Sequence, residues 1–342
     1  MPATSDFARV LEHLKDPDHA FPPTDLYLFS DLDQKDLAAL EAAWPEAPVE
    51  RRRALMQDLG EIGEANLEVQ FEAVFRLGLE DEDAEVRAAA VANLWESESP
   101  SLMAPFLDLM QHDPAPAVRA AAASALGRFV YLGEIDELPQ AQLRRVEDAL
   151  LAVINGGDDL EVRRRALEAI AFSGRPEVPD LIQSAYAAPD RRQRVSAVFA
   201  MGRSADARWG EAVLNELESG DPELRYEAAR AAGELELTHA VPALKRMVEE
   251  GDVQIREAAI WSLGQIGGDE AREILLTLLQ EAEDEVERDF IEDAMENLTF
   301  HDDRLDFPLL KADQDELDEL FDAEDDDDLD DTPSLPPHQR LN

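Results

Sequence analysis

The stretch Gly251–Gly264, with the sequence GDVQIREAAIWSLG, decides the fold of this chain. Asp252 suits a helix N-cap, because its carboxylate accepts hydrogen bonds from the free N–H groups of the first turn. Ile255, Ala259 and Leu263 follow at intervals of four residues and fall on one face of a helix. The stretch therefore predicts a turn followed by an amphipathic helix.

Variants of this stretch recur along most of the chain, and an arginine near the start of each predicted helix aligns them. This anchor arginine stands at Arg52, Arg87, Arg119, Arg163, Arg194, Arg225, Arg256 and, in a degenerate copy, Arg288. Most of the intervals are 31 or 32 residues, which is enough for two short helices and two turns. One interval is longer because of an insertion around residues 131–139. A first helix precedes each anchored helix, for example at residues 67–79.

The composition favours helices over sheets. Apolar residues make up 45% of the chain and aromatic residues only 6%, and alanine and leucine dominate the apolar set. The position three residues after the anchor is most often alanine, which lets neighbouring helices approach closely. Strand-like alternation is absent from the body of the chain. The sequence therefore predicts an all-α fold, an α-solenoid of about eight helix pairs.

Three parts follow from this pattern. Residues 1–47 are expected to form an N-terminal helical cap, since a solenoid must cover its first apolar face. Residues 48–300 form the repeat solenoid, and residues 301–342 form an acidic, largely disordered tail. Residues 313–331 carry thirteen acidic side chains and no basic one, so this run cannot condense alone. Within it, Leu317, Leu320 and Phe321 would share one helical face, as a docking motif or as part of a solubilising tail.

The charge of the chain limits its partners. There are 78 acidic and 31 basic residues, and the formal net charge is −47. Such a field repels nucleic acids and anionic membranes and attracts basic proteins, although it also serves solubility alone. The absence of cysteine excludes disulfides and thiol catalysis. No signal peptide and no apolar run of about 18 residues is present, so we expect a cytoplasmic, monomeric protein without a membrane or nucleic-acid partner.

The repeated pattern Asp-x-x-Val-Arg-x-x-Ala-x-x-x-Leu-Gly resembles the HEAT repeat, in particular the bacterial phycobilisome-lyase HEAT-like variety. The resemblance covers about residues 48–298, and three copies carry it most clearly: Asp83/Val86/Arg87/Ala90/Leu94, Asp221/Leu224/Arg225/Ala228/Gly233 and Asp252/Ile255/Arg256/Ala259/Leu263/Gly264. It implies a HEAT-type α-solenoid with a structural ladder of Asp and Arg side chains between adjacent repeats. The expected ladder comprises Asp83, Arg87, Arg119, Asp159, Arg163, Asp190, Arg194, Asp221, Arg225, Asp252 and Arg256. A row of phosphate-binding arginines is the alternative, which the net charge disfavours.

No motif for catalysis stands out. HEAT-like hydroxylases use repeated His-Glu pairs as iron ligands, and none of the six histidines here precedes a glutamate. Nucleophile-elbow, phosphate-loop and dinucleotide motifs are also absent. We therefore expect no metal, no cofactor and no enzymatic activity. Lyases that attach bilin chromophores to antenna proteins have similar repeats, but repeats describe a scaffold and not a reaction.

The anchored helices of a curved solenoid would line its concave side, where a partner could bind. Positions one and five residues after the anchor should face outward there. The resulting candidate ridge consists of Arg164, Phe199, Tyr226, Arg230 and Trp261, and aromatic and arginine side chains are favoured anchors for protein partners. Phe199 and Trp261 could instead simply pack against neighbouring helices.

The leading hypothesis is a non-catalytic scaffold or adaptor that binds a protein on its concave face. One alternative is that the acidic tail and surface bind a basic protein. The other is a bilin-lyase-like or other HEAT-like enzyme.

Overall fold

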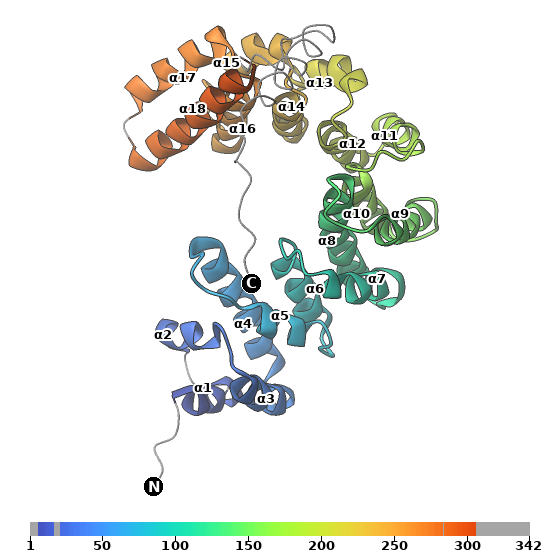
Figure 1. The fold of residues 1–342 in the computed structure, drawn as a ribbon, viewed down its shortest axis with the longest axis vertical. Helices are drawn as coiled ribbons and strands as arrows, with labels where there is room; N and C mark the ends of the chain where they lie inside the picture. The colour runs from blue at the N-terminus through green and yellow to red at the C-terminus, as the bar shows by residue number, and fades with distance from the viewer. Residues whose placement is uncertain (1–5, 17–20, 283, 306–342) are drawn as a thin grey trace, which may run out of the picture. The chain divides into compact units, whose positions relative to one another are not determined.

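The fold is that of a computed structural model, which describes residues 6–16, 21–282 and 284–305. Every regular element in these ranges is an α-helix or a short 3-10 helix, without a strand. The prediction of an all-α solenoid is therefore confirmed for the described residues. The chain divides into two compact units, residues 1–235 and residues 236–342, and each is described by itself (Figure 1). The predicted tail motif Leu317, Leu320 and Phe321 lies outside the described residues.

The first unit contains fourteen described α-helices. They are α1 (Asp6–Lys15), α2 (Pro23–Leu26), α3 (Gln34–Ala43), α4 (Val49–Ala65), α5 (Glu72–Gly78), α6 (Ala84–Asn93), α7 (Met103–His112), α8 (Pro116–Glu134), α9 (Gln140–Ile154), α10 (Leu160–Ile170), α11 (Val178–Tyr186), α12 (Arg191–Arg203), α13 (Gly210–Glu216) and α14 (Pro222–Glu234). Four 3-10 helices accompany them: η1 (Tyr27–Phe29), η2 (Trp44–Glu46), η3 (Pro100–Leu102) and η4 (Ala207–Trp209).

The second unit continues the same arrangement of helix pairs. Its described elements are η5 (Thr238–Ala240), α15 (Val241–Met247), α16 (Val253–Ile266), α17 (Asp269–Glu281) and α18 (Glu285–Leu305). Helix α15 packs on α16, α17 packs on α18, and α16 packs on α18. The stretch Gly251–Gly264 forms the turn before α16 and most of that helix, as its pattern predicts.

Two layers of helices build the repeats of the first unit. The anchored helices α4, α6, α8, α10, α12 and α14 pack each against the next, and α5, α7, α9, α11 and α13 each pack on the anchored helix that follows. Figure 1 shows α8, α10 and α12 on the inner side of the curve and α7, α9 and α11 outside them. The side chains between the layers, such as Val86, Val118 and Val162, are fully buried. Burial of this apolar stripe is the main term that stabilises each pair.

The residues before the first repeat are attached to it by apolar and polar contacts. Helix α1 packs on α3 and buries one apolar face. The indole of Trp44 donates a hydrogen bond of 2.7 Å to Asp81 in the next repeat, and Arg52 Nε lies 2.9 Å from the same carboxylate. All three side chains are buried. The boundaries of the cap, solenoid and tail stay predictions.

Two segments differ from the local sequence pattern. Helix α5 begins at Glu72 and not at residue 67, because Asn66 starts a turn in which its side chain accepts a hydrogen bond from Glu68 N. Leu67 is consequently 91% exposed. The insertion around residues 131–139 mostly lengthens α8, which continues to Glu134 and buries Leu132.

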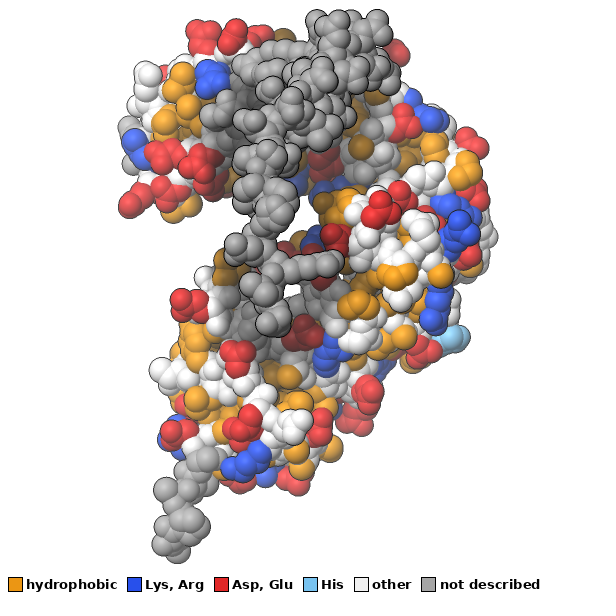
Figure 2. All heavy atoms as spheres, in the orientation of Figure 1, with side chains coloured by type: hydrophobic (Ala, Val, Ile, Leu, Met, Phe, Trp, Pro, Cys, Tyr) orange, Lys and Arg blue, Asp and Glu red, His pale blue; other side chains and the backbone are white. Residues whose placement is uncertain are grey.

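The surface carries the excess of acidic side chains that the composition implies. Acidic groups are spread over the described part of the face shown in Figure 2, with fewer Lys and Arg among them. None of the helices in the described ranges is long and apolar enough to cross a membrane.

Candidate functional site

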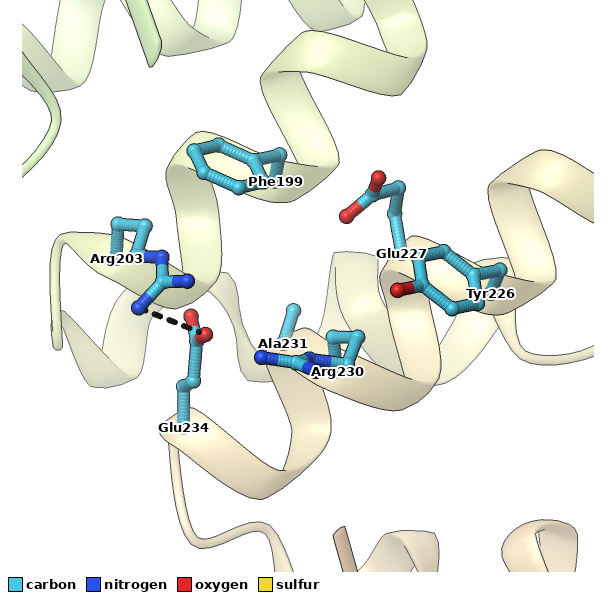
Figure 3. Close-up of a pocket in the computed structure, with 7 residues that line it drawn as sticks. All are labelled: Phe199, Arg203, Tyr226, Glu227, Arg230, Ala231 and Glu234. Atoms are coloured by element: carbon cyan, nitrogen blue, oxygen red, sulfur yellow. Dashed lines mark ion pairs between the residues drawn. The ribbon is translucent and has the colours of Figure 1, made fainter. Parts of the chain in front are cut away.

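A pocket opens between α12 and α14 in the first unit. Its cavity has a volume of about 170 Å³ and is lined by Phe199, Arg203, Tyr226, Glu227, Arg230, Ala231 and Glu234. Figure 3 shows Phe199 and Arg203 on one helix, facing the five residues of the other. Asp190 and Asp221 cap the two helices by accepting hydrogen bonds from Gln193 N and Glu223 N. The repeat thus brings aromatic rings, guanidinium groups and carboxylates together.

One wall of the pocket is an ion pair stacked on a ring. Arg203 Nη1 lies 3.3 Å from Glu234 Oε1, and the guanidinium lies 5.2 Å from the ring centroid of Phe199. Such a cation–π contact fixes the orientation of both side chains. Burial raises the pKa of Glu234, against the opposing effect of Arg203 and Arg230.

Glu227 has the most perturbed carboxylate of the pocket. Burial raises its pKa to about 7, and the charges of Glu168, Glu234 and Glu223 act in the same direction, while Arg230 opposes them. No hydrogen bond or ion pair of this side chain is found among the described residues. A carboxylic acid that titrates near neutral pH can give up or take up a proton under physiological conditions. Perturbed carboxylates in a cleft are candidates for functional groups.

A row of rings and guanidinium groups leads away from the pocket through the turn after α10 to α8. Arg203 also lies 5.5 Å from the ring of Phe172, and Phe172 meets Tyr131 edge-on at 5.5 Å. Arg128 in turn stacks over Tyr131. Arg203 therefore contacts two rings, and Phe172 connects it to Tyr131 on α8.

The predicted ridge residues have different environments. Phe199, Tyr226 and Arg230 line the pocket together, whereas Trp261 lies on α16 in the second unit. Arg164 does not reach this pocket. It pairs with Glu161 at 2.8 Å and with Glu168 at 3.1 Å. Whether a partner uses the ridge stays a prediction.

The predicted ladder residues form both caps and links between repeats. Asp83, Asp159, Asp190, Asp221 and Asp252 each accept hydrogen bonds from the first turn of an anchored helix. Arg87 pairs with Asp113 and Arg119 with Asp158 in the following repeat. Arg256 pairs with Glu287, and Arg163 donates to Ile154 O. Arg194 Nε is buried without a hydrogen-bond partner in the described chain, and Arg225 donates to Ser219 O.

Asp83 and Asp221 receive their inter-repeat contacts from other arginines. Arg53 Nη2 lies 2.6 Å from Asp83 Oδ2, and Arg191 Nη2 donates a hydrogen bond of 2.7 Å to Asp221 Oδ1. Neither arginine is an anchor: Arg53 directly follows Arg52, and Arg191 stands three residues before Arg194.

The sequence alone missed the three charged residues Arg203, Glu227 and Glu234. Acidic residues are so frequent in this chain that the presence of a glutamate does not by itself mark a functional position. A signal exists at Glu227, which stands two residues after the anchor, where four other repeats carry alanine: Ala54, Ala89, Ala121 and Ala258. Glu227 therefore departs from the residue type that is most frequent at this position, although Arg165 and Phe290 depart from it as well. No group of metal-ligating side chains occurs in the described ranges.

Comparison with known proteins supports the repeat assignment. The family model for HEAT repeats matches residues 72–142 and 210–296. Bilin biosynthesis protein PecE of Mastigocladus laminosus is 36% identical over 110 residues, which are 30% of this chain and 41% of that protein. The chain therefore spans about two fifths of the length of this curated relative.

A solved structure shares the fold at low sequence identity. The complex of CpcE and CpcF of phycocyanin lyase from Nostoc sp. PCC7120 contains a chain that is 17% identical with a TM-score of 0.52, covering 83% of this chain and 97% of that one. Human deoxyhypusine hydroxylase in complex with glycerol is 16% identical with a TM-score of 0.34, covering 87% of this chain and 97% of that one.

The prediction of a non-catalytic scaffold or adaptor is wrong, and so is the prediction that the chain is not an enzyme. The sequence relative is a bilin biosynthesis protein, and a phycocyanin lyase component shares the fold. A search for catalytic motifs could not have revealed this, because the repeats carry none. The bilin-lyase-like alternative agrees better with these similarities.

The recurring Asp-capped helix pairs and the family match agree over residues 72–142 and 210–296, and these two stretches consist of HEAT repeats.

Proposed function

We propose that this chain acts on bilins in the manner of a bilin lyase, with the pocket between α12 and α14 as the bilin site. The observation that carries the proposal is the 36% identity over 110 residues to a bilin biosynthesis protein. The pocket adds independent chemical support, because its side chains suit this ligand.

A bilin is an open chain of four pyrrole rings with two propionate groups. The rings of Phe199 and Tyr226 offer surfaces on which a conjugated pyrrole can stack. The guanidinium group of Arg230 would pair with a propionate, while Arg203 is held in place by Glu234 and Phe199. The volume of about 170 Å³ is below the roughly 300–1,000 Å³ of a complete ligand site. We therefore expect one end of the bilin to enter.

Glu227 would supply the proton chemistry. Attachment of a bilin to a thiol forms a C–S bond across a C=C bond, and the thiol proton ends on the adjacent carbon, so no oxidant is needed. The thiol belongs to the acceptor protein, since this sequence contains no cysteine. A carboxylic acid with a pKa of about 7 is matched to deliver a proton near neutral pH.

Absorbance titration with biliverdin tests the binding step. We expect wild-type protein to shift the biliverdin spectrum, and Arg230→Ala and Phe199→Ala to weaken binding by about tenfold. Arg208→Ala, at an exposed position on η4, is the matched control and should bind as wild type does. Equal affinities of all four proteins would contradict the pocket assignment.

A second assay tests the chemistry. Glu227→Gln should retain biliverdin binding but slow the attachment of a bilin to a phycocyanin subunit by about 100-fold relative to wild type. Reactions without the chain give the spontaneous rate. Attachment by wild type at that spontaneous rate would overturn the proposed activity.

The remaining expectations about partners and place are proposals as well. The net charge of −47 favours a basic protein partner. We propose that the chain is monomeric and cytoplasmic, and sedimentation of the purified protein and fractionation of the host cells test the two points separately.

A further inference from the structure

Trp95 departs from the residue pattern of the repeat. It stands eight residues after its anchor, where six other repeats carry a small residue: Gly60, Gly127, Ala171, Gly202, Gly233 and Gly264. A Cβ atom added at Gly127 would lie 3.1 Å from Ala169 Cα, and one at Gly202 would lie 2.8 Å from Ala231 Cα. Neighbouring helices therefore meet at this position, which leaves no room for an indole.

The structure accommodates Trp95 by ending the helix early. Helix α6 stops at Asn93, and the chain turns at the next residues, so that Trp95 is 56% exposed. Its ring makes no hydrogen bond and no aromatic contact with any residue that the structure describes. Asn93 takes the inner position and donates a hydrogen bond of 2.8 Å to Met56 O. The packing of the repeat therefore does not account for the tryptophan.

Trp95 borders a groove in the first unit. The groove has a volume of about 370 Å³ and runs between the end of α4, residues 66–71 and the turn after α6. Leu67, which is 91% exposed, lies on its rim, and Phe71 and Phe75 contribute to its apolar wall. Two large exposed apolar side chains at one groove indicate a protein contact, and tryptophan is a frequent anchor of such contacts.

The charges at the rim indicate what kind of segment binds. Glu64 and Glu96 line the groove, and neither carboxylate has an ion pair or a hydrogen bond within the described ranges. Glu72 also lines it but is paired with Arg76. No lysine or arginine is among the described lining residues. The rim thus presents two unneutralised negative charges next to an apolar surface.

We propose that this groove docks a segment of a partner protein in which apolar side chains alternate with lysine or arginine. Apolar groups would cover Trp95 and Leu67, while the basic groups would pair with Glu64 and Glu96. Residues 313–331 of this chain carry thirteen acidic residues and no basic one, and a second copy has a formal net charge of −47. Like charges therefore disfavour both as occupants. The proposal is independent of the bilin pocket.

Fluorescence anisotropy with a fluorescein-labelled peptide of alternating leucine and lysine tests the proposal. We expect Trp95→Ala and Leu67→Ser each to raise the peptide Kd by about tenfold, as for central anchors of an interface. Glu64→Gln combined with Glu96→Gln should raise it by at least about threefold. A peptide of leucine and glutamate should not bind.

Matched variants separate this site from general attraction to an acidic protein. Ile135→Ala removes an apolar side chain that is 48% exposed elsewhere, and Glu80→Gln combined with Glu211→Gln removes two exposed charges. Both control variants should leave the peptide Kd within about twofold of the wild-type value. Equal effects of the groove and control variants would overturn the proposal. So would sedimentation that shows a wild-type dimer dissociated by Trp95→Ala, because the occupant would then be a second copy. Biliverdin binding should be unchanged in every groove variant.

Discussion

At the scale of single residues, the chain separates carboxylates that stabilise the fold from carboxylates that destabilise it. Asp83 accepts hydrogen bonds from two backbone N–H groups and pairs with Arg53. Glu227 lies in a pocket beside other acidic groups. Among the neighbouring charges that shift its pKa, that of Arg230 favours the ionised form and those of the glutamates oppose it. The first arrangement favours the ionised form of the carboxyl, and the second favours its protonated form. Opposite pH dependences follow from this contrast.

Glu227→Gln should stabilise the protein above neutral pH. Because the folded-state pKa of about 7 lies above the unfolded value, the folded protein binds more protons between about pH 4.5 and pH 7, so the stabilising effect of the proton is lost as pH rises through this window. After allowance for partial exposure, the variant should gain about 1–2 kcal/mol at pH 8 and nothing at pH 4.5. Urea unfolding at both pH values measures this. Glu80→Gln is the control, and an equal gain from both variants would contradict the assignment.

Asp83→Ala should destabilise the protein at neutral pH. The Arg53 guanidinium is the main cause that holds the pKa of Asp83 at about 2. The stabilising effect of the Asp83 carboxylate is therefore complete above the unfolded pKa and is lost as pH falls from about 4 to 2. We expect a cost of about 1–2 kcal/mol at pH 7. Asp83→Asn retains the capping oxygen and should cost less.

Urea unfolding at pH 7 and pH 3 measures the effect of these two variants. A cost of Asp83→Ala that stays constant from pH 7 to pH 3 would show that the charge of the Asp83 carboxylate contributes nothing to stability.

At the scale of helices, stacking depends on positions without a side chain. Glycine eight residues after the anchor lets α12 approach α14 so closely that a Cβ at Gly202 would lie 2.8 Å from Ala231 Cα. By contrast, a Cβ at Gly63 in α4 would meet nothing closer than Phe71 Cδ2 at 3.9 Å. The same residue type therefore has a packing role in one helix and none in the other.

Gly202→Ala should separate α12 from α14 and destabilise the first unit by about 1–3 kcal/mol. Gly63→Ala should be neutral or stabilise by up to about 1 kcal/mol, because alanine has the higher helix propensity. Thermal unfolding followed by circular dichroism distinguishes the pair. Equal melting temperatures of the two variants would refute the close approach at Gly202.

At the scale of the whole molecule, charge repulsion opposes folding. Individual ion pairs such as Arg87–Asp113 and Arg119–Asp158 link adjacent repeats, yet acidic residues outnumber basic ones by 47. Screening weakens the pairs and the net repulsion together, and the repulsion is the larger of the two effects when the imbalance is this large.

Raising NaCl from about 10 mM to about 500 mM should therefore increase the melting temperature by several degrees. Calorimetry of the full chain measures it. A melting temperature that falls with salt would mean that the ion pairs between repeats outweigh the net repulsion.

The sequence by itself determined the fold, because the repeat states one packing pattern many times. Asp252, Ile255, Arg256, Ala259 and Leu263 are local signals of a cap and an apolar helical stripe. They specify α16 without knowledge of any distant residue. Positions at which the copies disagree, such as Glu227 and Trp95, carry no such local meaning.

Only the tertiary structure decided what those exceptions do. The pKa of Glu227 depends on Glu168, which is 59 positions earlier in the chain, and the exposure of Trp95 depends on where α6 ends against α4. Likewise, Arg53 and not the anchor Arg52 reaches Asp83, since adjacent side chains on one helix point in directions about 100° apart. Local periodicity fixes which residues face the core. The pocket and the groove depend on distances between side chains on different helices. These distances are set only when the chain folds, so local sequence patterns do not reveal them.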